Sequence, residues 1–365
     1  MCLLPNAGSF GMAVSTAMIF GLVSLMFLDT SINMAMQPFK MMVGDMVNEK
    51  QKGLAYSIQS FLCNAGSLVV FLFPFIFTWI GISNIAPQGV VPDSVIYSFY
   101  IGAAILILCV IYTTVKVKEM PPAEYAEYHG ITEEEEKEKI NMVKLLIKAP
   151  KAFWTVGLVQ FFCWFAFMFM WTYTNGSVAA NVFDAPTVET AVNGVSKVML
   201  DTKSIQYQDA ADWVGVLFAV QAIGSVLWAV CIPLFKDRKL IYSLSLVLGG
   251  LGFISTYFVH NQYVLFISFL LIGCAWAAML ALPFTILTNA LSGGHMGTYL
   301  GLFNGTICIP QIVAASLGGS ILALFTPKGM LPPEINMLVM AGVMLIIGAV
   351  CVYLIKETKG EQTKA

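Results

Sequence analysis

Charged side chains are the scarcest feature of this 365-residue sequence. They make up 11% of it, as 19 Lys+Arg and 21 Asp+Glu, whereas ordinary globular domains contain about 25%. Hydrophobic residues reach 58%. A folded chain of this length needs far more polar cover in water, so a soluble fold is excluded. Spans of about 20 apolar residues leave room for roughly eight to ten helices, and the composition predicts an all-α, polytopic membrane protein.

Several chemical signatures are also absent. Arginine occurs once, at Arg238, and the formal net charge is -2, so there is no basic surface of the kind that binds nucleic acid. The cysteines other than Cys2 lie in apolar runs and lack metal-ligand spacing, which argues against a metal site. No phosphate-binding glycine loop and no nucleophile motif is present, so we expect neither an enzyme nor a cofactor. Residues 1–28 carry no charge, which argues against a signal peptide.

The apolar runs between charges predict nine spans: 10–40, 54–80, 94–115, 152–175, 211–235, 240–259, 263–288, 298–325 and 335–355. In the polar stretch 116–151, Thr132 and Glu135 form a capping box in an acidic run, and we expect a surface helix there. The loop 176–210 shows no motif that predicts structure. The expected domains are a helical bundle (1–115), a cytoplasmic linker with an amphipathic helix (116–151), a six-helix bundle (152–358) and a tail (359–365).

Basic residues indicate the orientation in the membrane. They gather in the loops at 40–53, 116–151, 236–239, 289–297 and 356–365, which alternation places on one side. By the positive-inside rule this side is cytoplasmic. We therefore expect a multi-pass protein of the plasma membrane with its carboxyl terminus in the cytoplasm.

A loose internal repeat relates two predicted helix starts. Lys52–Ser57 aligns with Met296–Gly301, 244 residues later, and Ser60 and Ser67 align with Asn304 and Gln311. Six spans separate the copies, which is the period of a fold built from two six-helix halves. Because only one span precedes the first copy, we expect three helices before residue 1 to be missing; a true nine-span protein is the alternative.

Asp29 is the one carboxylate predicted to lie well inside a span. It lies about 16 Å from Lys40 along a helix, close to the middle of a hydrocarbon core of about 30 Å. Burying an acid there costs about 2.5 to 3.5 kcal/mol, so we expect Asp29 to be a proton-coupling residue. Asn33 and Gln37 follow on the same face. A structural hydrogen bond to a neighbouring helix is the alternative.

A second stripe lies in the span 152–175, where Gln160, Trp164, Met168, Trp171 and Asn175 share a helix face. Indoles flanked by amides suit a sugar, since the ring stacks on the aromatic face and the hydroxyls bond the amides. Helix packing or an interfacial aromatic belt is the alternative. The complete set of candidate substrate contacts is Asn33, Gln37, Asn64, Gln160, Trp164, Gln221, Asn304 and Gln311.

Two stretches resemble a known family. Leu28–Asn33 through Gln37-Pro38 to Gly44-Asp45, and Met296–Asn304 through Ile309-Pro310-Gln311, are similar to the fourth helix and the tenth-to-eleventh helix region of sucrose and maltose proton symporters. These belong to the glycoside, pentoside and hexuronide branch of the major facilitator superfamily. The resemblance implies that the chain corresponds to helices four to twelve and carries a disaccharide with a proton by alternating access.

The resemblance also implies gating residues. Asp237-Arg238, between two predicted spans, is similar to the short Asp-Arg turn that such transporters place between helices of one half, and Asp45 ends the fourth-helix pattern. The expected partners are a sugar, a proton and the lipid bilayer, and the sequence sets no oligomeric state. Two alternatives stay open: a sodium-coupled, melibiose-like carrier, and a transport-dead membrane scaffold or sensor whose output is the segment 116–151.

Overall fold

The computed structural model describes residues 14–48, 51–82, 91–118, 121, 124, 142–192, 195–291, 296–327 and 329–355. Within these residues, nine helical segments are long and apolar enough to cross a membrane. Each of them coincides with one of the nine predicted spans. Most of the predicted start and end residues differ from the observed ones by only a few positions. The prediction of an all-α, polytopic membrane fold is confirmed.

The helices are α1 (Val14–Met46), α2 (Lys52–Trp79), α3 (Asp93–Lys116), α6 (Met142–Ile147), α7 (Lys151–Asn181), α8 (Ile205–Cys231), α9 (Arg238–Ser255), α10 (Leu265–Ala290), α11 (Met296–Phe303), α12 (Gly305–Phe325) and α13 (Ile335–Cys351). The 3-10 turns η2 (Ile232–Leu234) and η3 (Val352–Leu354) extend α8 and α13. The aligned repeat segments both begin helices, since α2 starts at Lys52 and α11 at Met296.

The loop between α7 and α8 differs from the prediction. α7 continues to Asn181 and α8 begins at Ile205, so the connection is shorter than 176–210. Within it, β1 (Thr187–Val192) pairs antiparallel with β2 (Val195–Leu200), with Val188 opposite Met199. Of the predicted surface helix in 116–151, the structure describes α6 near its end. The capping box of Thr132 and Glu135 and the tail 359–365 lie outside the described residues.

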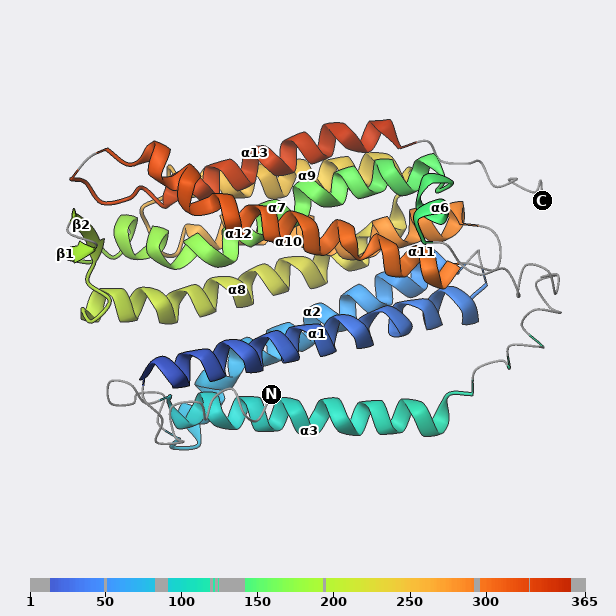
Figure 1. Cartoon of the computed structure of the whole chain (residues 1–365), viewed down its shortest axis with the longest axis horizontal. Helices are drawn as coiled ribbons and strands as arrows, with labels where there is room; N and C mark the ends of the chain where they lie inside the picture. The colour runs from blue at the N-terminus through green and yellow to red at the C-terminus, as the bar shows by residue number, and fades with distance from the viewer. Residues whose placement is uncertain are drawn as a thin grey trace. The chain divides into compact units, whose positions relative to one another are not determined.

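The chain divides into two compact units. The first comprises residues 1–46 and 69–139, and the second residues 47–68 and 140–365. Figure 1 shows the helices of the second unit from α7 to α13 side by side, with α6 and α11 at the end away from the β1–β2 hairpin. The contacts group residues 47–68 with the carboxyl-terminal helices, whereas the predicted first domain ran to 115. The boundaries at 115, 151 and 358 stay a prediction.

Helix α7 forms the core of the second unit, because it contacts α8, α10, α12 and α13. Its sequence has no charge after Lys151, and its buried side chains include Val156, Val159, Ala166 and Phe167, each with no exposed surface. A helix that is apolar around its whole circumference is buried by neighbouring helices. This central position buries Gln160, Thr174 and Ser177 of α7 inside protein, away from lipid.

Glycines bring α8, α9, α10 and α13 into backbone contact. On α9, a Cβ at Gly250 would lie 2.9 Å from the main-chain oxygen of Gly342 on α13. Also on α9, a Cβ at Gly252 would lie 2.6 Å from the main-chain oxygen of Ser268 on α10. Small residues permit this close approach, which stabilises helix pairs in lipid through van der Waals contact.

We expect Gly224→Ala on α8 to destabilise the second unit. A Cβ there would lie 2.5 Å from the main-chain oxygen of Leu270 on α10, so the two helices must separate. Overpacking of this kind costs about 1 to 3 kcal/mol. The matched control is Gly215→Ala on the same helix, which meets nothing within 4 Å and should gain up to about 1 kcal/mol of helix propensity. Thermal unfolding in detergent measures both, and equal shifts would contradict the assignment.

Candidate functional site

Three tryptophans of the second unit form one cluster, here called the indole group: Trp164, Trp171 and Trp276. Trp164 and Trp171 are on α7, with ring centroids 6.3 Å apart. Trp276 on α10 lies 5.7 Å from Trp164 and 5.8 Å from Trp171, edge to face with both. Phe167, fully buried, packs 4.8 Å from Trp276. The predicted stripe on α7 thus meets Trp276 of α10, a residue outside the predicted site.

The indole group runs from the core to an accessible face. Trp164 is 9% exposed, Trp276 is half-buried and Trp171 is 44% exposed. Trp276 is the large side chain in a run of small ones, Cys274-Ala275-Trp276-Ala277-Ala278. That isolation was a signal in the sequence, because small neighbours leave room around an indole. Adjacent ring faces of this kind can stack on the apolar face of a sugar.

A proline in α10 provides a polar contact beside the indole group. Pro283 has no N–H, so the carbonyl of Met279, four residues earlier, loses its helical partner. Gln160 on α7 donates from Nε2 to this carbonyl at 3.4 Å. Gln160 is fully buried, yet its Oε1 and the Nε1 of Trp164 have no hydrogen-bond partner among the described residues. Buried polar atoms without partners cost about 1 to 3 kcal/mol each, so both are suited to bonding a ligand.

The first part of α2 also contacts α10, next to Trp276. Ser60 donates from Oγ to the carbonyl of Ala277 at 3.4 Å. Asn64, one turn later and fully buried, donates from Nδ2 to the carbonyl of Ser60 at 2.7 Å. Its Oδ1 has no partner in the described part of the chain. Asn64, Gln160 and Trp164 therefore lie on two helices that both contact α10 close to Trp276.

Asn304 lies at a break between two helices, where α11 ends at Phe303 and α12 begins at Gly305. Pro310 removes the N–H that would pair with the carbonyl of Thr306, and the Thr306 hydroxyl donates to the carbonyl of Phe303 at 2.7 Å. A Cβ on Gly157 of α7 would lie 2.9 Å from the Thr306 methyl group, so the break packs one turn from Gln160. Broken helices frame many transporter binding sites.

The remaining predicted contacts of the second unit are less clustered. Gln221 on α8 is 6% exposed, and its backbone packs against Gly273 of α10, one turn from Trp276. Gln311 on α12 is half-buried. Trp228, on the same helix as Gln221, is not among the predicted contacts. It donates from Nε1 to the hydroxyl of Ser245 at 2.8 Å, which joins α8 to α9 and gives it a packing role.

The proton-coupling candidate belongs to the first unit. Asp29 is exposed on α1, and Asn33 donates from Nδ2 to the main-chain carbonyl of Asp29 at 2.9 Å, so this bond does not involve the carboxylate. Gln37 and Asp45 lie on the same helix, and their side chains are outside the described ones. The roles of these residues stay predictions.

The predicted gating pair lies at the start of α9. Asp237 is the N-cap residue, and its Oδ1 accepts from the main-chain N–H of Lys239 at 2.9 Å and of Leu240 at 3.0 Å. Such a cap stabilises the helix end by about 1 kcal/mol. The guanidinium of Arg238 lies near Gly53, at the start of α2. Their part in gating stays a prediction.

Glu334 is not among the predicted site residues, because it lies just outside the predicted span 335–355. It directly precedes α13, and its carboxylate packs against Gly176 of α7, where a Cβ would collide with it. Burial raises the pKa of Glu334 to about 7. The signal that could have drawn attention to it is a single acid following Pro332-Pro333.

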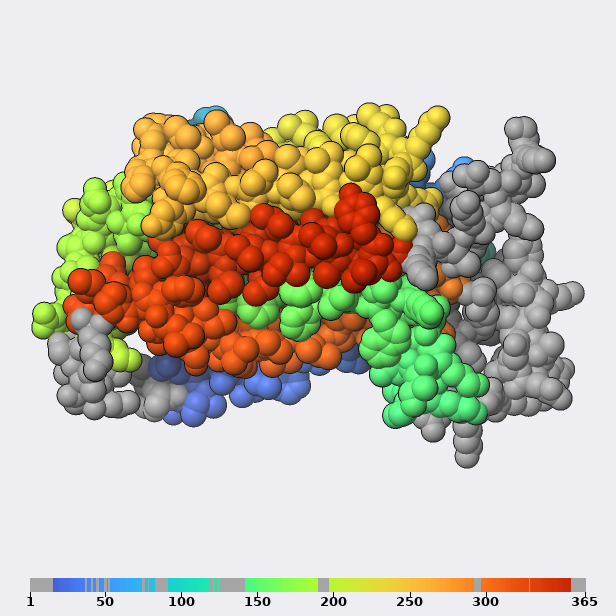
Figure 2. Space-filling view, turned by 90° about the horizontal axis from the view of Figure 1, so that it is seen from above, coloured from blue at the N-terminus to red at the C-terminus, as the bar shows by residue number. Residues whose placement is uncertain are grey.

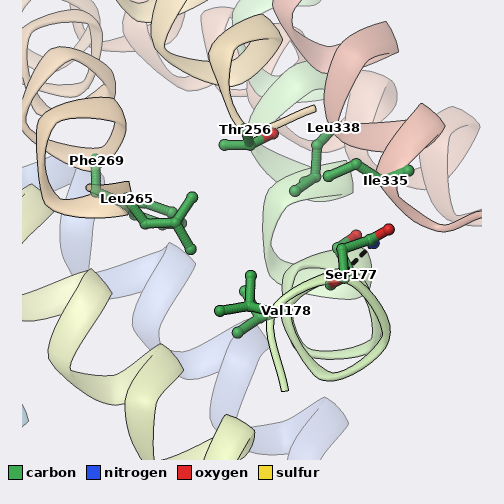
Figure 3. A pocket seen from close by; sticks show the side chains of 9 residues that line it. Ser177, Val178, Thr256, Leu265, Phe269, Ile335 and Leu338 are labelled. Carbon is green, nitrogen blue, oxygen red and sulfur yellow. Dashed lines mark hydrogen bonds between the residues drawn. The ribbon is translucent and has the colours of Figure 1, made fainter. Parts of the chain in front are cut away.

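A crevice in the same part of the unit lies away from the indole group. It lies between the ends of α7, α9, α10 and α13 (Figure 3). The residues that line it include Ser177, Val178, Thr256, Leu265, Phe269, Ile335 and Leu338. Its free space accommodates about one water molecule. It is too small for a sugar. Among the described residues, no group of three or more His, Cys, Asp or Glu could hold a metal ion.

Sequence comparison identifies the family. The profile of the Major Facilitator Superfamily matches residues 178–365, about half of the chain. The chain belongs to this superfamily. Its members are membrane transporters, and the chain is accordingly an integral, multi-pass membrane protein. No curated protein matches the sequence.

Solved structures show the same superfamily fold. The superfamily transporter FucP in its outward conformation matches with a TM-score of 0.63 and 13% identity, over 96% of this chain and 79% of FucP. A variant of the E. coli fucose:proton symporter FucP matches with a TM-score of 0.58 and 15% identity, over 96% and 81% of the two chains. At these identities the likeness concerns the fold alone.

Proposed function

We propose that this superfamily member is a sugar:proton symporter that carries a disaccharide, such as sucrose or maltose, by alternating access. The observation that carries the proposal is the buried pair of Gln160 and Trp164. Oε1 of Gln160 and Nε1 of Trp164 lack a hydrogen-bond partner among the described residues, beside the partly exposed indoles of Trp171 and Trp276. Aromatic faces next to buried amides complement a sugar, which presents apolar C–H faces and a rim of hydroxyls.

Two further observations support a sugar substrate. Asn64 and Asn304 add amides on α2 and at the α11–α12 break, so several helices of the second unit contribute hydrogen-bonding groups near α10. The fold is also that of the fucose:proton symporter FucP. The resemblance of Leu28–Asp45 to the fourth helix of sucrose and maltose symporters favours a disaccharide, with Asp29 as the proton site.

Counterflow tests this function directly. The complete gene product is reconstituted into vesicles loaded with sucrose, maltose, melibiose or fucose, and entry of the same radiolabelled sugar is measured. We expect trans-acceleration with a disaccharide and little with fucose. Acceleration by none of the sugars, from protein that is monodisperse and thermally stable, would overturn the proposal in favour of a scaffold or sensor.

The charges of the second unit suggest its orientation in the membrane. Consecutive spans alternate in direction, so the charged residues can be assigned to the two ends of the unit. One end carries the basic residues Lys144, Lys148, Lys151, Lys236, Arg238 and Lys239. The other end carries the acids Asp184, Glu189, Asp201, Asp209, Asp212 and Glu334, together with Lys197 and Lys203. By the positive-inside rule we propose that the basic end, and with it the carboxyl terminus, faces the cytoplasm of the plasma membrane.

Reporter fusions check this orientation. Fusions at residues 130 and 365 should both report the cytoplasm, and a fusion at residue 190, in β1, should report the opposite side, because α7 crosses the membrane between 130 and 190. Paired alkaline phosphatase and fluorescent protein fusions at each position provide the internal control. A cytoplasmic signal at 190 would reverse the assignment.

A further inference from the structure

The short helix α6 carries exposed apolar and basic side chains in adjacent stripes. Val143 and Ile147 are 68% and 78% exposed and lie one turn apart. Lys144 directly follows Val143, and Lys148 directly follows Ile147. Both lysines are exposed and form a stripe next to the apolar one. Leu145 and Leu146 are half-buried and face the protein. Exposed aliphatic side chains in water would cost free energy, so this arrangement suits a boundary between apolar and polar surroundings.

The length of α7 places α6 at the depth of the lipid headgroups. α7 has 31 residues, and at 1.5 Å per residue it is about 46 Å long, whereas the hydrocarbon core is about 30 Å thick. If α7 is centred, each end projects about 8 Å beyond the core, into the headgroup layer. Lys151 starts α7, and α6 ends four residues before it. Figure 2 shows this green segment projecting from the side of the unit.

α6 is held in place by the bundle. The hydroxyl of Tyr299 on α11 donates to the main-chain carbonyl of Leu145 at 3.3 Å. Tyr299 in turn packs against Phe153 on α7, with ring centroids 6.1 Å apart. Lys144 on α6 and Lys148 directly after it therefore project from a backbone that is fixed relative to α7 and α11. A fixed array of cations loses less entropy on binding anions than a mobile loop does.

We propose that α6, together with Lys148 and Lys151, is a binding surface for anionic phospholipid. Lys144, Lys148 and Lys151 contact the phosphates of the headgroups, and Val143 and Ile147 insert at the top of the acyl chains. Lysines reach headgroups with their ammonium groups while their methylene stems cover apolar surface. Near an anionic leaflet, each lysine contributes about 1 kcal/mol. The inference does not depend on which substrate the chain carries.

A photocrosslinking amino acid at Ile147 tests the surface. The complete gene product is reconstituted into phosphatidylcholine vesicles with about 30% phosphatidylglycerol, and the crosslinked lipids are identified by mass spectrometry. Each lysine contributes about 1 kcal/mol near an anionic leaflet, so we expect the ratio of phosphatidylglycerol to phosphatidylcholine among the crosslinked lipids to be about fivefold higher than in the bulk. The matched position is Leu324 at the other end of the unit, 85% exposed, where the crosslinked lipid should follow the bulk composition.

Charge variants separate lipid binding from general adhesion. Lys144→Gln/Lys148→Gln/Lys151→Gln should bring the lipid at position 147 to the bulk ratio, whereas Lys197→Gln/Lys203→Gln should leave the enrichment unchanged. Raising the salt to 0.5 M should reduce it, as expected for exposed charges. Should the triple variant misfold, Lys148→Gln alone should lower the enrichment about twofold. Three outcomes would overturn the proposal: lipids crosslinked at position 147 of the wild type that match the bulk composition, an enrichment that the triple variant leaves unchanged, or crosslinks to protein in place of lipid.

Discussion

Asp29→Asn is expected to abolish uphill sugar accumulation while sparing sugar exchange at equal concentrations. Asparagine has the shape of the protonated acid and lacks its charge, so the loaded carrier can still reorient but carries no proton. The proposal rests on Asp29 as the acid in the middle of the first predicted span. The measurements are sugar-induced alkalinisation and counterflow, in vesicles that contain the complete gene product.

The control for Asp29→Asn is Asp184→Asn, in the loop after α7, which should change neither activity. Loss of both activities in Asp29→Asn, with poor folding, would assign the residue a structural role. Undiminished alkalinisation would rule it out as the proton carrier, and Glu334, whose pKa is about 7, would be the next acid to replace. Accumulation driven by sodium in place of protons would favour the melibiose-like alternative.

Trp164→Ala is expected to weaken sugar binding by about tenfold. Removal of an aromatic contact of this kind costs about 1 to 2 kcal/mol. Trp164 joins the indole group to Gln160, one turn away, so its loss removes both a stacking face and the Nε1 donor. Trp276→Ala should have a similar effect, because the two rings are in contact. Equilibrium binding of the sugar to purified protein measures both.

Trp154→Ala is the matched control for Trp164→Ala. Trp154 is on the same helix and 52% exposed, close to the basic end of α7, and lies outside the indole group. It should leave sugar affinity unchanged. If Trp164→Ala lowers only the amount of folded protein, at unchanged affinity, the indole group serves packing.

The spans were predictable because their cause is local. An uncharged run of sufficient length must form a helix in lipid, where each backbone polar group needs an internal partner. The hairpin had a local signal too, since Asn193-Gly194 separates two segments rich in β-branched residues. The expectation of a loop without structural motifs is wrong for Thr187–Val192 and Val195–Leu200, which form the two strands of the hairpin. The break at Asn304 has a partial signal in Pro310, six residues later.

The contacts of the candidate site were not predictable in the same way. Trp276 meets Trp164 only because α7 and α10 cross at that level, and no periodicity within α7 contains that information. The partner of Gln160, the carbonyl of Met279, depends on a proline in another helix. The stripe of α7 was therefore identified from its own spacing, whereas its neighbours required the packed structure.

The glycine contacts of α9 bear on how the protein is made. α9 has 18 residues and a mean hydropathy of 1.2, the lowest of the candidate spans in the described chain, whereas α13 reaches 2.6. Its glycines gain little from lipid: Gly250 gains contact only when α13 packs against it, and Gly252 only when α10 does. α13 is synthesised last of the three. During synthesis, α9 therefore stays incompletely packed until α13 has been made and inserted beside it.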